Sequence, residues 1–264
     1  MNRRKSIIWS SILLVSVVSI FCAYKFGDRM CRTYFDKPLT MEVIVEQVSA
    51  MTQGTRLPKG KWSYGIDISH HQPIIRWSKL RILLDEDRMT VWSKRNSKIE
   101  VPIDYVIMKA SEGENFKDWR FKGRWQKSLK HGYKRGAYHF FRPGKDASAQ
   151  ANNYIRQVGP IQSADFAPIL DIEVMDDLSA DNLNKRALEW LKIIEKHYGR
   201  KPIVYANPYY LKNVLSTEIT HNYPIWVANY GVSSPSWTRW HMWQFTDRAL
   251  VRGVGCADLN VRPL

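Results

Sequence analysis

Residues 167–174 read Ala167-Pro168-Ile169-Leu170-Asp171-Ile172-Glu173-Val174, a short apolar run that two acids interrupt. Side chains alternate along a β-strand, so Asp171 and Glu173 share one face while the apolar side chains share the other. Two acids on the inward face of a buried strand are costly unless the strand ends at a wet or functional surface. The run therefore predicts a buried strand that ends at a functional site; partnered carboxylates at a rim are the structural alternative.

Similar short apolar runs recur on both sides of this segment. They predict further strands at Tyr64–Ser69, Tyr105–Ala110, Arg135–Phe141, Ile203–Asn207, Ile225–Tyr230, Met242–Thr246 and Val254–Leu259. Helices are predicted between the earlier strands, at Trp119–His131, at Ala147–Val158 and from a cap at Ser179 to just before Gly199. Strands that alternate with helices favour parallel pairing with the helices outside.

The predicted fold class is α/β: an irregular TIM-like barrel with about five β/α units and three further strands. The last three strands follow one another closely, because the connections after Ile225 carry little helical pattern. Residues Leu84–Pro102, rich in Asp, Arg, Lys and Ser, are expected to form a loop inserted into the first helix-to-strand connection. Barrels of this type carry their active sites at the carboxyl ends of the strands, where Asp171 and Glu173 are expected.

The N-terminus has the pattern of a membrane anchor. Three cations in residues 1–5 precede an apolar run from Ile7 to Tyr24. As a helix this run would be roughly 27 Å long, near the hydrocarbon thickness of a bilayer. The cations favour a cytoplasmic N-terminus, and hence a following domain on the periplasmic or extracellular side. A cleaved signal peptide and a lipid-modified Cys22 stay open as alternatives.

The expected organisation has three parts. Residues 1–25 form a cytoplasmic tip and transmembrane signal anchor, residues 26–62 form a juxtamembrane tether, and residues 63–264 form a catalytic barrel. Of the remaining cysteines, Cys31 and Cys256 either pair outside the cytoplasm or stay free thiols.

The formal net charge of +15 predicts a polyanionic neighbour, such as nucleic acid, anionic lipid or an acidic polymer of the cell wall. Zinc-finger spacing, a Walker loop and a basic heptad pattern are missing from the sequence, and the N-terminus indicates export. Nucleic acid is therefore not expected as a partner.

Two further acids lie on the first and last predicted strands. A closed barrel makes these strands neighbours, so Asp67 and Asp258 are expected to face each other and to complete a four-carboxylate ring with Asp171 and Glu173. Crowded like charges raise some pKa values and can keep a glutamic acid protonated near neutrality. Hydrolysis of a glycosidic bond needs one such acid and one ionised partner. Binding of Mg²⁺ or Ca²⁺ is the other use of clustered carboxylates.

Aromatic and amide side chains near the same strand ends are candidates for sugar binding. Aromatic faces pack on sugar C–H surfaces, and amides hydrogen-bond to hydroxyl or acetamido groups. A core role for each tryptophan, and a buried structural role for the histidine, are the alternatives. The candidates are Tyr138, His139, Trp226, Asn229, Gln244 and Asn260.

Several motifs, in order, resemble those of the family 25 glycoside hydrolases, the Chalaropsis-type lysozymes. The resemblance covers roughly residues 63–260 and is specific because the motifs occur together. They are Gly65-Ile66-Asp67-Ile68-Ser69 with Gln72 and Trp77; Val106-Ile107-Met108-Lys109-Ala110-Ser111-Glu112-Gly113; Gly136-Ala137-Tyr138-His139-Phe140; Asp171-Ile172-Glu173; Pro224-Ile225-Trp226-Val227-Ala228; Trp243-Gln244-Phe245-Thr246; and Gly253 through Asp258-Leu259-Asn260.

The resemblance implies a barrel with five β/α units and three further strands. It also implies cleavage of the β-1,4 bond from N-acetylmuramic acid to N-acetylglucosamine in peptidoglycan glycan strands, with no cofactor and no metal. By position, Glu173 matches the proton donor of the family, while Asp171, Asp67 and Asp258 match its other active-site carboxylates. Asp171 is expected to orient or stabilise the oxocarbenium-like centre.

Two other functions stay open. A chitinase-like hydrolase also places acids at a strand end, although the denser acidic run of that class is missing here. A non-catalytic peptidoglycan-binding module could use the same barrel without turnover. The N-terminal segment and the insertion at Leu84–Pro102 depart from the catalytic pattern of the family.

Overall fold

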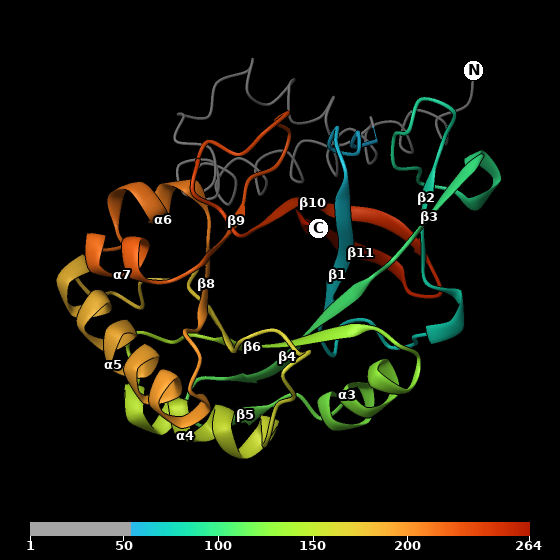
Figure 1. Ribbon diagram of the computed structural model, residues 1–264. Coiled ribbons are helices and arrows are strands. Elements are labelled where there is room, and N and C mark those ends of the chain that lie inside the picture. The colour runs from blue at the N-terminus through green and yellow to red at the C-terminus, as the bar shows by residue number, and fades with distance from the viewer. Residues whose placement is uncertain (1–53) are drawn as a thin grey trace, which may run out of the picture. The chain divides into compact units, whose positions relative to one another are not determined.

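Eight strands close into a barrel in the computed structural model, which describes residues 54–264 (Figure 1). Successive neighbours from β1 to β10 are parallel. The last strand, β11, runs antiparallel to both β10 and β1 and closes the ring. The barrel strands are, in order, β1 (Trp62–Ile68), β4 (Tyr105–Glu112), β6 (Lys134–Phe140), β7 (Ile169–Asp171), β8 (Ile203–Ala206), β9 (Ile225–Ala228), β10 (Met242–Arg252) and β11 (Gly255–Pro263).

The helices lie outside the ring of strands (Figure 1). The predicted helix at Ala147–Val158 is confirmed as α4, capped by Asp146, whose Oδ1 accepts a hydrogen bond from the Ala149 N–H at 2.6 Å. The second long prediction is confirmed as α5, which Ser179 caps and which ends at Gly199, in the left-handed conformation that favours glycine. The α-helices are α3 (Phe121–Lys130), α4 (Ala147–Val158), α5 (Ala180–Tyr198), α6 (Pro208–Asn213) and α7 (Thr217–Asn222).

The connection from β1 to β4 differs from the prediction. It contains two 3-10 helices, η1 (Trp77–Lys79) and η2 (Lys94–Asn96), and a hairpin of β2 (Arg81–Leu84) and β3 (Ile99–Pro102). Residues 85–98 of the expected inserted loop connect β2 to β3, and its last four residues form β3; in the described chain, α-helices follow only β4, β6, β7 and β8. Each strand of this ribbon has only four residues, and Glu100 and Pro102 of β3 are exposed, so the sequence carried no clear strand pattern here.

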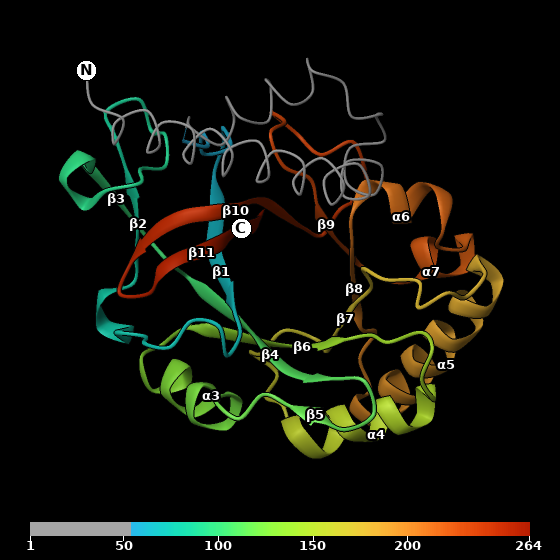
Figure 2. The same cartoon turned by 180° about the vertical axis from the view of Figure 1, so that it is seen from behind.

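The ribbon extends the sheet beyond the barrel. β2 pairs antiparallel with the far half of β10, where Ile82 lies opposite Val251. A two-residue strand, β5 (Phe116–Lys117), folds back on the end of β4. Figure 2 shows β2 and β3 across the barrel from α5 and α6, so the helices and the ribbon cover different sides of the ring.

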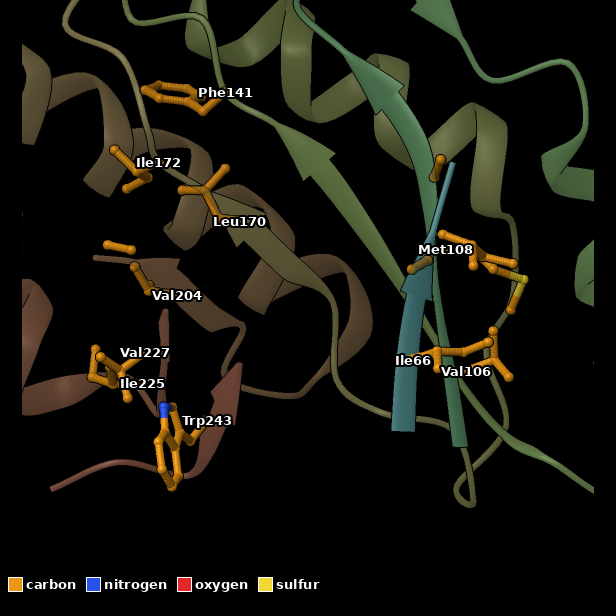
Figure 3. Close-up of a cluster of buried hydrophobic side chains, with 14 of the residues drawn as sticks. Ile66, Val106, Met108, Phe141, Leu170, Ile172, Val204, Ile225, Val227 and Trp243 are labelled. Atoms are coloured by element: carbon orange, nitrogen blue, oxygen red, sulfur yellow. The ribbon is translucent and has the colours of Figure 1, made fainter. Parts of the chain in front are cut away.

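Alternation along the strands creates two apolar layers. The outer layer includes Leu170 and Ile172 on the strand side (Figure 3). It joins them to helix residues such as Trp190 and Leu191, and all four are fully buried. The inner layer fills the barrel with aromatic and aliphatic side chains. It includes Tyr105, Ile107, Phe166, Ile169, Ile203, Tyr205, Trp226 and Met242.

The predicted anchor (residues 1–25), Cys31 and most of the predicted tether lie outside the described residues. Residues 54–62 already belong to the folded unit, since Leu57 is buried and Thr55 Oγ1 donates to Thr246 Oγ1 at 3.1 Å. Cys256 is exposed. Between residues 54 and 264, no helix combines the length and the apolar character that crossing a membrane requires.

Candidate active site

The four predicted carboxylates come together at one end of the barrel. Asp67 near the end of β1 lies opposite Asp258 of β11, and Asp171 is the last residue of β7. Tyr138 lies on β6, next to β7. Burial raises the pKa of its phenol well above the usual range, and the negative charges of all four acids, Asp171, Asp67, Asp258 and Glu173, raise it further. The predicted ring of carboxylates is therefore arranged around a single phenol.

Asp67 and Asp258 lie side by side, and the side-chain amides of Gln244 and Asn260 hold them in place. Gln244 Nε2 donates to Asp67 Oδ2 at 2.8 Å and to Asp258 Oδ2 at 3.4 Å, and Asn260 Nδ2 donates to Asp67 Oδ2 at 2.7 Å. Burial raises the pKa of Asp67, and these hydrogen bonds oppose that shift. Burial, followed by the charge of Asp67, raises the pKa of Asp258 well above its usual range. Burial and the closeness of the two carboxyls therefore favour the protonated form, more strongly at Asp258 than at Asp67.

Asp171 and Glu173 form the second pair. Asp171 is only 6% exposed, whereas Glu173 is half-buried and lies nearer the surface. Burial raises the pKa of Asp171 well above its usual range, and the charge of Glu173 and a hydrogen bond between the two carboxyls raise it further. Lys109 on β4 opposes this shift. The protonated form of Asp171 is therefore favoured relative to a carboxyl in water.

Three further neighbours of the acids, Lys109, Tyr205 and Tyr230, were not among the predicted site residues. Lys109 lies beside Asp171 and donates to Glu112 Oε2 at 2.6 Å. The Tyr205 hydroxyl donates to Gln244 Oε1 at 2.9 Å, and the Tyr230 hydroxyl donates to the same oxygen. These two bonds fix the amide so that its nitrogen faces the acids. Strand alternation would have placed Tyr205 inside, on the same face as Ile203.

Trp226 and Asn260 lie in the site, but Trp226 is a supporting residue. Its ring is 2% exposed inside the barrel, and its Nε1 donates to Asn260 Oδ1 at 2.9 Å. The bond orients Asn260 so that its other end donates to Asp67. Trp226 therefore acts through Asn260. Its ring is part of the core, which was the alternative to a sugar-binding role.

His139 does not join the predicted binding residues. It follows Tyr138 on β6 and so points to the opposite face, where it is fully buried and stacked on Trp190 of α5. Its ring contacts Ser111 Oγ at 2.8 Å and Gln150 Oε1 at 3.1 Å. Burial lowers the pKa of His139 to about 4. The prediction of a substrate-binding histidine is therefore wrong, and the structural alternative holds.

Asn229 also has a structural task. Its Oδ1 accepts hydrogen bonds from the Ser236 backbone N–H at 3.0 Å and from the Ser236 hydroxyl at 3.2 Å. Its backbone carbonyl accepts from Trp243 Nε1 at 2.7 Å. These contacts anchor the loop that leaves β9, next to the site.

The arrangement is suited to acid–base chemistry. Four carboxyls crowd together, and burial and mutual repulsion leave some of them protonated. The amides of Gln244 and Asn260 stabilise a carboxylate on Asp67. Among residues 54–264, no group of three or more His, Cys, Asp and Glu side chains is arranged to hold a metal ion.

Comparison with known proteins agrees with this geometry. The family model described as "Glycosyl hydrolases family 25" matches residues 66–254. The chain is 35% identical over 209 residues to "Uncharacterized protein YegX" of Escherichia coli strain K12, covering 78% of this chain and 71% of that protein. It is 27% identical to "Lysozyme M1" of Streptomyces globisporus, covering 74% of this chain and 66% of that protein.

Solved structures give the same result. The bacterial lysozyme of Streptomyces coelicolor matches with a TM-score of 0.64 at 25% identity, covering 76% of this chain and 92% of that one. A family 25 glycosyl hydrolase of Bacillus anthracis has the same fold, with a TM-score of 0.65 at 24% identity, covering 81% and 94%. The fold, the carboxylate site and the match over residues 66–254 lead to one conclusion: this chain belongs to glycosyl hydrolases family 25.

Proposed function

We propose that this chain is an N-acetylmuramidase that hydrolyses the β-1,4 bond from N-acetylmuramic acid to N-acetylglucosamine in peptidoglycan. The observation that carries the proposal is the crowding of four carboxyls at one end of the barrel. Burial and like charge raise the pKa values of Asp171 and Asp258, which favours the presence of acid and carboxylate forms together. Glycoside hydrolysis requires this combination.

Glu173 is the proton donor in this proposal. It is hydrogen-bonded to the more deeply buried Asp171, and it is the member of the pair nearer the surface. When Glu173 protonates the leaving oxygen, the bond to the anomeric carbon breaks and positive charge develops on the sugar.

Asp171 then stabilises the positive charge. As Glu173 takes up the proton of the shared hydrogen bond, Asp171 becomes the carboxylate that faces the oxocarbenium-like centre or the acetamido group beside it. Asp67, held by Gln244 and Asn260, adds negative charge across the site. Tyr138 lies among the four carboxyls and is the binding residue closest to the chemistry.

The relatives support a wall substrate. Lysozyme M1 of Streptomyces globisporus and "Autolytic lysozyme" of Clostridium acetobutylicum both match this chain. The proposal also keeps residues 7–24 as a membrane anchor, with the barrel on the outer side of the membrane. A fusion that reports the location of the C-terminus tests this part, and a cytoplasmic C-terminus would contradict it.

The test of the reaction is digestion of purified peptidoglycan by the full-length chain, followed by reduction and mass analysis of the new reducing ends. We expect reduced N-acetylmuramic acid, because the bond cleaved lies on its anomeric carbon. Reduced N-acetylglucosamine would contradict the assignment of the bond.

Glu173→Gln, measured beside the matched control Glu189→Gln on the exposed face of α5, assigns the donor. We expect release to fall about 10²–10⁴-fold in the first variant only. Tight wall binding by the wild type without any release would instead identify the chain as a non-catalytic peptidoglycan-binding module.

A further inference from the structure

A cavity of about 410 Å³ lies at the end of the barrel opposite to the carboxylates. Its walls come from residues at the start of the parallel strands and from the end of the antiparallel β11. Its volume is in the range of small-ligand pockets. The polar residues that line it are all basic: Lys134, Arg200, Lys201, His241 and Arg262.

No acid lines this cavity, and none of the ion pairs within residues 54–264 includes its lysines or arginines. The neighbouring Asp165 is already held by Arg135 through two hydrogen bonds, of 2.6 and 3.0 Å. The charge of Asp165 offsets part of that of Lys134, but no ion pair within residues 54–264 neutralises the lysines and arginines of the cavity.

The cations are held in place rather than spread into solvent. Arg200 Nη1 donates to the Asp165 carbonyl, and Lys201 Nζ donates to the Asn222 carbonyl, each at 2.9 Å. Lys134 Nζ lies 4.5 Å from the centre of the Phe166 ring, and Arg262 Cζ lies 5.7 Å from the same ring. The Phe166 ring thus lies close to two of the cations.

Keeping these cations together is unfavourable without an anion. Burial and the charges of Arg262 and Arg200 lower the pKa of Lys134. Burial and the charges of Arg262 and Lys134 lower the pKa of His241. Arg262 Nε is buried and has no hydrogen-bond partner among residues 54–264. An anion in the cavity would relieve the repulsion between the cations and would accept a hydrogen bond from Arg262 Nε.

We propose that this cavity is a binding site for a phosphate group. Arginine presents a planar fork of donors that matches phosphate oxygens, and lysine adds point charge. Phosphate offers more acceptor oxygens than a carboxylate and, as the free ion, more charge, whereas a carboxylate would leave most of these cations unmatched. The site lies apart from the carboxylates, so it does not depend on the proposed hydrolysis. Its ligand is either free phosphate or the phosphate of a lipid headgroup.

Calorimetric titration of the full-length chain with inorganic phosphate, at low ionic strength, tests the site. We expect saturable binding that Lys134→Gln/Arg262→Gln weakens at least about tenfold, which corresponds to about 1.4 kcal/mol. The matched control Lys127→Gln/Lys130→Gln removes the same charge from exposed positions of α3 and should bind as the wild type does.

If the double variant does not fold, Lys134→Gln alone is used, because this side chain is exposed at the first position of β6. A weaker loss in the same direction is expected. The absence of saturable binding, or equal weakening in the cavity and control variants, would overturn the proposal.

Titration with glycerophosphoglycerol, the water-soluble headgroup of phosphatidylglycerol, separates the two sources. Binding at least as tight as that of inorganic phosphate, and lost in the cavity variant, supports a lipid headgroup. Binding of inorganic phosphate alone supports free phosphate.

Discussion

The two ends of the barrel carry opposite charges, and each end brings like charges close together. The carboxyl end gathers Asp67, Asp171, Glu173 and Asp258. The amino end gathers Lys134, Arg200, Lys201 and Arg262. Strand direction produces this separation, because the residues that begin parallel strands meet at one end and those that finish them meet at the other.

The difference between the ends lies in how each relieves its repulsion. The acids take up protons, which is why burial and like charge raise the pKa values of Asp171 and Asp258. The arginines keep their protons in proteins, so the amino end needs an anion instead. The two proposals, proton donation at one end and anion binding at the other, thus rest on the same kind of charge crowding.

Asp171→Asn should have the largest effect at the carboxyl end, because it is expected to lower the activity and to raise the stability of the fold. We expect the rate of reducing-end release to fall about 10²–10³-fold, since a stabilising charge is lost from the transition state. The melting temperature at pH 7 should rise by about 2 °C or more, the shift that ~1 kcal/mol gives in a domain of this size.

The pH dependence supplies the control. Because the folded state raises the pKa of Asp171, its ionisation costs stability once the pH exceeds the unfolded pKa, about 3.9. The gain from Asn should therefore vanish near pH 3, where the carboxyl is protonated in both states. Asp87→Asn, at an exposed position, should change neither quantity. A lower melting temperature for Asp171→Asn at pH 7 would contradict the raised pKa.

Gln244→Glu tests the amide that holds the Asp67–Asp258 pair. The substitution keeps the oxygen that accepts from Tyr205 but replaces the donor to Asp67 with another carboxyl. We expect the acid limb of the pH–rate profile to move to higher pH, because Asp67 loses a hydrogen bond that stabilises its anion. The rate at pH 6 should fall about 10–100-fold. A uniform loss with an unmoved profile would assign Gln244 a purely structural role.

The smallest expected change in activity comes from substitution of His139. This residue lies on the outer face of β6, away from the carboxylates. Burial lowers its pKa to about 4, so its neutral form stabilises the fold above the unfolded pKa, about 6.5, and this contribution is lost as the pH falls toward 4. The free energy of unfolding should drop by roughly 2–4 kcal/mol over this range.

His139→Gln should flatten that drop, and its rate on wall fragments at pH 7 should stay near that of the wild type when the variant folds. His131→Gln, at an exposed position, is the matched control. If His139→Gln abolished activity in a folded protein, our placement of this residue outside the site would be wrong.

Local signals explain what could be predicted from the sequence. The helices at 147–158 and 180–198 are bounded by Asp146, Gly159, Ser179 and Gly199, which act within a single turn. The four carboxylates could be brought together because a barrel makes its first and last strands neighbours. The helix prediction needs only the local sequence pattern, and the carboxylate prediction needs only the closure of the barrel.

Long-range pairing explains what could not be predicted. β2 is stabilised by pairing with the far half of β10, about 170 positions later in the chain, and β3 pairs in turn with β2. The cations of the amino end come from separate parts of the chain, at residues 134, 200–201 and 262, so the sequence showed them only as net charge. His139 was a different error, because alternation after Tyr138 already placed it on the opposite face.

The most direct test of the account measures both ends in one experiment. Glu173→Gln and Lys134→Gln/Arg262→Gln are compared with the wild type for release of reducing ends from soluble wall fragments and for phosphate binding. We predict that Glu173→Gln loses release and retains phosphate binding, while the cavity variant loses phosphate binding and retains release. Undiminished release by Glu173→Gln would contradict the central claim that the carboxyl end performs the hydrolysis.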